Sequence, residues 1–177
     1  MSGSWYKSLR WNDVRFPATG LNPIGSAKPP TIDTDDGTLL FSGNSENSIA
    51  AAFQIDHGIK IGLLHPHIHY ERTTAAAGNP SFSLEYKIKK IFHPSGNWVT
   101  FFDNGYSPVR DNIDAGWHNI QAFGYLDIKA LDLIVSDMIM FRMTRHGDTD
   151  SYGGNIKLLE FDVHAQFESN GSVHEFG

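Results

Sequence analysis

Three histidines spaced two residues apart give this sequence its strongest chemical signal. They are His65, His67 and His69, within Gly62-Leu-Leu-His-Pro-His-Ile-His-Tyr-Glu71. Residues two apart on a β-strand point to the same face, so the three imidazoles are expected to share one face, with Leu64 and Ile68 on the other. Neutral imidazole nitrogens are good ligands for divalent metals. The sequence therefore predicts a divalent-metal site on this strand.

A second run offers compatible groups. In Phe161-Asp-Val-His-Ala-Gln-Phe167 the apolar residues alternate with Asp162, His164 and Gln166. If the two strands were neighbours, His164 would complete either a three-histidine set or a set of two histidines and one carboxylate.

The same histidines also allow a simpler interpretation, as ordinary polar residues on a strand face that meets solvent or another subunit. Pro66 lies within the run and cannot donate a hydrogen bond to a neighbouring strand, which predicts an edge strand or a bulge. Both interpretations remain open on the sequence alone.

The histidine run resembles the first of the two motifs of the cupin family. His65-x-His67, Glu71 and Gly78 have the later spacings of that motif, whereas the second motif is matched poorly. The resemblance implies a jelly-roll fold with a metal inside its barrel, and a small metalloprotein that acts on a small molecule. The implied ligands are His65, His67, Glu71 and His164.

No other group of residues predicts catalysis. The run from Asp148 to Gly153 begins like a calcium loop, but Leu159 stands where the loop needs a late glutamate. No nucleophile elbow, phosphate-binding glycine loop or dinucleotide motif is present. We therefore expect a protein that is not an enzyme and has no cofactor other than the divalent ion considered above, with a cupin-like metalloenzyme as the alternative.

The chain that must position these residues alternates with a period of two from residue 38 onward. Eight segments are expected as strands: about 38–42, 49–55, 63–72, 82–88, 98–103, 120–128, 138–145 and 156–168. No segment predicts a convincing amphipathic helix. The pattern predicts one all-β domain over residues 38–177, an antiparallel two-sheet β-sandwich of jelly-roll type with about eight strands.

Residues 1–37 break this alternation with prolines and glycines. Their candidate interface side chains are Trp5, Tyr6, Trp11 and Phe16. A segment this apolar is expected to lie on a surface. We predict an extended N-terminal arm that packs on its own sandwich or on a neighbouring subunit.

Composition narrows the choice of partners. The 177 residues carry a formal net charge of −6 and no cysteine, which excludes disulfides and thiolate metal sites. No apolar run approaches the roughly 20 residues that span a bilayer, and no basic stripe predicts nucleic-acid binding. We expect a soluble protein made in the cytoplasm, with no membrane partner and no nucleic-acid partner.

Three stretches, in this order, resemble a group of small structural proteins of tailed bacteriophages. They are Leu9-Arg-Trp-Asn-Asp-Val-Arg-Phe-Pro17, Phe53–Gly62 leading into His65–Tyr70, and Leu158–His164 ending in Gly171-Ser172. In the group, the central stretch reads Gln-x-Pro-His and then Pro-His-x-His-Trp. This chain has Ile55-Asp56-His57 at the first of these places, and Tyr70 in place of the final tryptophan at the second. The resemblance implies a virion protein of the capsid decoration, neck or tail. Such a protein would contact other virion proteins and other copies of itself, as a trimer or another symmetric homo-oligomer.

A third possibility is a carbohydrate-binding sandwich. Trp98 and Trp117 are the side chains that would provide a stacking platform for a sugar ring.

Overall fold

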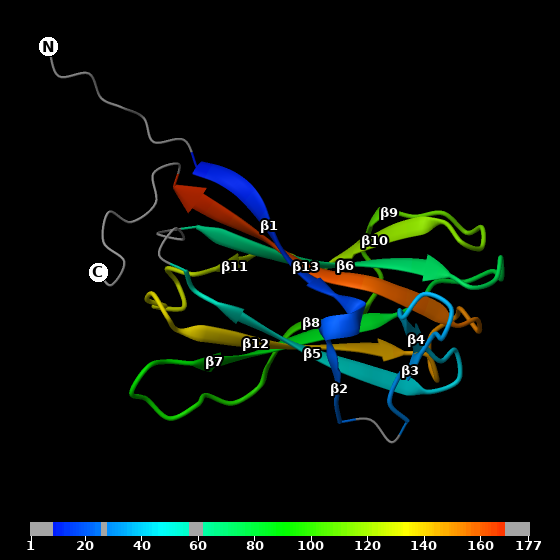
Figure 1. Cartoon of the computed structure of the whole chain (residues 1–177), viewed down its shortest axis with the longest axis horizontal. Helices are drawn as coiled ribbons and strands as arrows, with labels where there is room; N and C mark the ends of the chain where they lie inside the picture. Colours follow the sequence, from blue (N-terminus) through cyan, green and yellow to red (C-terminus); the bar gives the residue numbers. More distant parts are fainter. Residues whose placement is uncertain (1–8, 26–27, 57–61, 169–177) are drawn as a thin grey trace, which may run out of the picture.

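Two antiparallel sheets pack face to face in the computed structural model, which describes residues 9–25, 28–56 and 62–168 (Figure 1). The larger sheet has the strand order β3-β4-β13-β6-β10-β9, with β1 also beside β13 and β11 also beside β6. Its strands are β1 Leu9–Pro17, β3 Thr31–Ile32, β4 Leu39–Phe41, β6 Leu63–Arg72, β9 Pro108–Arg110, β10 His118–Ala122, β11 Leu126–Asp127 and β13 Ile156–Glu168. The smaller sheet has the order β2-β5-β12-β7-β8. Its strands are β2 Asn22–Pro23, β5 Glu46–Gln54, β7 Phe82–Lys89, β8 Val99–Gly105 and β12 Met138–His146.

The predicted fold class is confirmed: the protein is an all-β, antiparallel two-sheet sandwich with a jelly-roll-like architecture. The eight expected segments all contain strands, and residues 120–128 divide into β10 and β11. Four further strands, β1, β2, β3 and β9, bring the total in the described residues to thirteen. Within those residues the only helical element is the 3-10 turn η1, Ala18–Gly20, and no helix is long and apolar enough to span a membrane.

The core between the sheets follows from the period-two alternation. On β13, Phe161 and Val163 are fully buried, and the ring of Phe161 lies 5.5 Å from that of Phe141 on β12 of the other sheet. On β6, Tyr70 makes a similar contact with Phe82 on β7, with 5.7 Å between ring centroids. Because alternate residues fill this core, the remaining residues of β6 and β13 must face outward.

Part of the segment predicted as an arm is a strand of the sandwich. Residues Leu9–Pro17 form β1 and pair antiparallel with β13, from Leu9 opposite Glu168 to Pro17 opposite Glu160. Just after β1, Ala18 and Leu21 are buried in the core. Over the described residues, the extended N-terminal chain therefore lies on its own sandwich.

The edge-strand position predicted from Pro66 is wrong, because β6 lies between β13 and β10 in the larger sheet. The Pro66 carbonyl accepts a hydrogen bond from the Phe123 amide at 3.1 Å, so the missing amide hydrogen of Pro66 would point to the same side. On that side β10 ends at Ala122 and β11 begins at Leu126. The interruption between β10 and β11 lets an interior strand accommodate a proline.

Two buried arginines connect the sheets at one end of the sandwich. Arg72 ends β6 in the larger sheet, and Arg145 lies near the end of β12 in the smaller one; both are fully buried. Their guanidinium carbons lie 4.8 Å and 5.5 Å from the ring centroid of Tyr152, which is buried as well. This end of the molecule is held by charge and cation–π contacts as well as by apolar packing.

Candidate functional site

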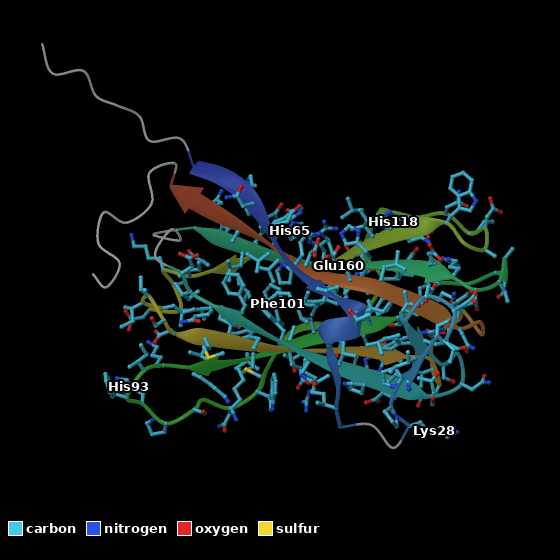
Figure 2. All side chains as sticks on the ribbon, in the orientation of Figure 1. Lys28, His65, His93, Phe101, His118 and Glu160 are labelled. Carbon is cyan, nitrogen blue, oxygen red and sulfur yellow. The ribbon has the colours of Figure 1, made fainter. Side chains whose placement is uncertain are left out.

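Five histidines share the outward face of the larger sheet. β6 provides His65, His67 and His69, β10 provides His118, and β13 provides His164. They come together because β6 pairs with both strands: His164 is opposite His65, and Ile120, two residues after His118, is opposite His69. Figure 2 shows His65 and His118 on the outer side of this sheet, away from Phe101. The prediction that the three β6 histidines share one face opposite Leu64 and Ile68 is confirmed, since both of these apolar residues are fully buried in the core.

Four of these histidines, all except His118, line a groove of about 340 Å³, which we call the histidine groove. Its lining residues are Asp13, Arg15, His65, His67, His69, Val109, Ile120, Asp162 and His164. Although these residues face outward, the floor of the groove is secluded: His67 is 4% exposed and Asp162 is 2% exposed. The histidine groove therefore places a carboxylate and an imidazole out of contact with bulk water.

Asp162 and two histidines converge on one point of this floor. The Nε2 atoms of His67 and His69 are 3.1 Å apart, and Oδ2 of Asp162 lies 3.6 Å from the first and 3.3 Å from the second. The other carboxylate oxygen, Oδ1, is buried and has no hydrogen-bond partner among the described residues. These three side chains have the residue types and spacing of a metal-ligand set.

The remaining ring nitrogens of the two histidines have partners of their own. Nδ1 of His67 lies 3.3 Å from the backbone carbonyl oxygen of His65, an acceptor that requires Nδ1 to carry the proton. Nδ1 of His69 lies 2.6 Å from Nε2 of His118. When His69 donates in that contact, both Nε2 atoms facing Asp162 carry lone pairs.

Burial keeps the central imidazoles neutral. The pKa of His67 is lowered to about 4, mainly by loss of solvation and to a smaller extent by the nearby His164 and His69, while the carbonyl oxygen of His65 and the Asp162 carboxylate act in the opposite direction. Burial, with a smaller contribution from His164, also lowers the pKa of His65. At neutral pH these rings are acceptors or ligands rather than cations.

At the β1 side of the groove, polar and aromatic contacts surround this centre. Nε2 of His164 lies 2.8 Å from Oδ1 of Asp13, which connects β13 to β1. The guanidinium of Arg15 donates to Glu160 at 2.7 Å. The ring of Tyr125 stacks on His65, with centroids 4.2 Å apart, and lies 6.2 Å from the ring of Trp11.

The sequence-predicted ligands fall into two groups. His65, His67, His69 and His164 all line the histidine groove, as a neighbouring β6 and β13 would require. Glu71 is not among the groove residues and lies in register with His118 on β10 and Lys157 on β13. The cupin-type arrangement, with the metal inside the barrel, differs from this structure, because Leu64, Ile68 and Tyr70 occupy the inward positions beside the histidines and the histidines face outward.

The candidate aromatic residues have different positions. Trp5 and Tyr6 lie outside the described residues. Trp11 is 45% exposed on the outer face, whereas Phe16 is partly buried and packs on Phe161, 6.1 Å between centroids. Phe16 is therefore engaged with its own core.

Sequence reasoning placed Asp162 on the polar face of its strand without identifying it as a ligand, and it did not include His118, Asp13 or Tyr125 in the site. Asp162 had a usable signal, since it alternates with core residues on a strand that also carries His164. The other three residues enter through strand pairing and loop placement, which no local pattern encodes.

Of the two tryptophans considered for sugar binding, Trp98 is covered by Arg142, 4.7 Å from its ring, and Trp117 is 57% exposed.

Acid should destabilise the metal-free protein through His67. Its pKa is about 4 when folded and about 6.5 when unfolded, so the unfolded chain takes up the proton first as pH falls. The contribution of His67 to the free energy of unfolding is intact above pH 6.5. Between pH 6.5 and pH 4 the free energy of unfolding falls by about 2–3 kcal/mol as this contribution is lost. Urea unfolding in the presence of a chelator measures this slope, and His67→Gln should flatten it. The exposed His93→Gln variant is the control, and an unchanged slope in His67→Gln would contradict the prediction.

No family model matches the sequence, and no curated protein matches it. Similar solved structures include a family 35 carbohydrate-binding module from Clostridium thermocellum, at 12% identity and a TM-score of 0.44, covering 86% of this chain and 97% of the module. A structure of infectious bursal disease virus has 7% identity and a TM-score of 0.42, covering 90% of this chain and 32% of the virus chain. Tailspike protein 4 of bacteriophage CBA120 has 7% identity and a TM-score of 0.35, covering 89% of this chain and 19% of the tailspike chain. This chain thus spans about a third or less of the two viral chains, and the similarities are to jelly-roll-like β-sandwiches at low identity.

Proposed function

We propose that this protein is a non-enzymatic structural component of a tailed-phage virion, located in the capsid decoration, neck or tail. In this role it forms a symmetric homo-oligomer and docks on neighbouring virion proteins. The observation that carries the proposal concerns the three stretches that resemble phage structural proteins. Leu9–Pro17 is β1, His65–Tyr70 lies in β6 and Leu158–His164 lies in β13, and β13 has β1 on one side and β6 on the other over residues 160–165. Phe53 and Gln54, at the start of the second stretch, belong to β5 of the smaller sheet, and Gly171-Ser172 lies outside the described residues. Parts of all three stretches, far apart in sequence, therefore lie side by side in the larger sheet, as a shared docking surface would require.

The outer face of that surface has the composition of a contact site. Trp11 is 45% exposed, Tyr125 57% and Val109 65%, and all three lie beside or within the histidine groove. Apolar side chains grouped around a polar groove are typical of protein–protein contacts. We assign this face to contact with a second copy of the chain, because symmetric self-association is the usual way to form oligomers.

Mass measurement tests this assignment. The full chain has a mass of 19.7 kDa, and its molar mass measured by size-exclusion chromatography with light scattering should be two or more times that value. The double substitution Trp11→Ser and Tyr125→Ser should raise the dissociation constant by about 30-fold or more, as expected for aromatic contact residues. The matched control is Phe92→Ser, since Phe92 is fully exposed on the loop after β7 of the other sheet. A strictly monomeric wild type, or equal effects of both variants, would contradict the assignment.

Location is tested on particles of the virus that carries the gene. An antibody against the purified protein should label intact tailed particles at regular positions on the capsid, neck or tail. Protein that remains in the lysate and is absent from gradient-purified particles would overturn the proposed function.

A further inference from the structure

We infer that His67, His69 and Asp162 bind one divalent transition-metal ion, with zinc as the best match, on the outer face of the larger sheet. This site goes beyond the proposed structural role and does not depend on it. It also changes the ligand set expected from the sequence: Asp162 is a ligand, and Glu71, His65 and His164 are not.

The three donor atoms have the spacing of ligands in a zinc site. Zinc binds imidazole nitrogen at about 2.0–2.1 Å and carboxylate oxygen at about 2.0–2.2 Å, so two ligand atoms of a tetrahedral site are about 3.3 Å apart. The three separations here are 3.1, 3.3 and 3.6 Å. The donors thus already form one face of a tetrahedron of the size that zinc requires.

The Asp162 carboxylate is buried without a hydrogen-bonded cation. The side chain is 3% exposed, its Oδ1 has no hydrogen-bond partner among the described residues, and its Oδ2 faces two imidazole nitrogens. Arg15, the residue opposite it on β1, donates to Glu160 and acts on Asp162 only through the charge of its largely exposed guanidinium. A buried carboxylate without a bonded cation is costly, and a metal ion would supply that cation.

The two rings are oriented with their Nε2 atoms toward Asp162. The carbonyl oxygen of His65 holds the proton of His67 on Nδ1, and Nδ1 of His69 lies 2.6 Å from Nε2 of His118. In the tautomer in which His69 donates to His118, both Nε2 lone pairs are directed to the same point as Asp162. Metal-binding histidines commonly have such a partner on the second ring nitrogen, which fixes the ring and its tautomer.

The ligand types favour zinc over calcium or magnesium, because those ions prefer oxygen ligands and two of the three donors here are imidazoles. The same three residues line the histidine groove, so a fourth coordination position is open to it. His164, which also lines the groove, has its Nε2 bound to Asp13, so we do not include it among the ligands.

Titration of the untagged, chelator-treated full chain with zinc chloride in a calorimeter tests the site. We expect one zinc ion per chain, and binding of Co²⁺ to the same site should produce the visible absorption of a tetrahedral ion. Asp162→Asn and His69→Gln should each weaken binding by about 100-fold or more, and circular dichroism confirms that they are folded. Glu71→Gln, on the same strand and outside the groove, is the matched control and should bind as the wild type does.

Four results would overturn the inference. They are no saturable zinc binding, several weak ions per chain that Asp162→Asn leaves unchanged, loss of binding in Glu71→Gln, and a loss in His164→Gln as large as that in Asp162→Asn. Self-association can be measured on the same samples, so failure of the metal site and failure of the proposed oligomer are distinguishable.

Discussion

Replacing Arg145 by methionine should lower the free energy of unfolding by about 3–5 kcal/mol, because it leaves a buried carboxylate unpaired. Arg145 is fully buried, and its Nε donates to Asp150 at 3.1 Å. Its terminal nitrogens donate to the backbone carbonyls of Phe41, Tyr152 and Gly154 at 2.8–3.1 Å. Methionine fills much of the volume but satisfies none of these acceptors. Urea or thermal unfolding measures the loss.

Arg142→Met is the matched control for Arg145→Met. Arg142 lies on the same strand, but its side chain is 30% exposed, and it pairs with Glu85. Exposed ion pairs contribute up to about 1 kcal/mol, so this variant should remain close to the wild type. Similar losses of the free energy of unfolding in both variants would show that the buried charge of Arg145 does not stabilise the contact between the two sheets around Tyr152.

Asp162→Asn should make the metal-free protein more stable than the wild type, by about 1–3 kcal/mol. The substitution removes a desolvated charge. It also places a neutral amide where the carboxylate now lies, 3.3 Å from Nε2 of His69, and an amide can donate to or accept from that nitrogen in either tautomer of the ring. Zinc at a hundred times the wild-type dissociation constant should stabilise the wild type by about 2.7 kcal/mol, and this variant, with binding weakened about 100-fold or more, by at most about 0.4 kcal/mol. Chemical unfolding with chelator and with zinc gives both comparisons.

The control for Asp162→Asn is Asp13→Asn, since Asp13 is 52% exposed and pairs with His164 at the rim of the groove. It should show no gain in stability without metal and should keep the response to zinc. If Asp162→Asn were instead destabilising in chelator, the carboxylate would be compensated by a protonated imidazole, and a metal would be unnecessary for its charge balance.

The strands that carry the site were predictable because their two faces differ sharply. Residues 63–72 and 156–168 were expected as strands with those bounds, and β6 and β13 have them. Around the histidines of both strands, apolar core residues alternate with outward polar ones, as in Leu64, Ile68 and Tyr70 on β6 and Phe161, Val163 and Ala165 on β13, so the direction of each histidine follows from its position. By contrast, β1 was missed as a strand because it lies in a proline-rich segment, and its regularity comes from pairing with β13.

The chemistry of the groove floor could not be predicted to the same degree. A strand pattern tells which face Asp162 occupies, but the register of β6 against β13 decides that it lies opposite His67. That register includes an irregularity between Leu158 and Glu160, which no local pattern reveals. Pro66 was misleading for a related reason, because its position depends on where β10 stops.

The central position of β13 has a consequence for the order of events during synthesis. β13 pairs with β1, β4 and β6, all of which precede it in the chain. A nascent chain emerging from the ribosome would therefore carry these strands with open edges until β13 is translated, and open edges invite wrong pairings. Because the pairings are far apart in sequence, closure of the larger sheet should be a slow, late step. His67 and Asp162 meet only at that step, so zinc uptake would mark the completion of folding.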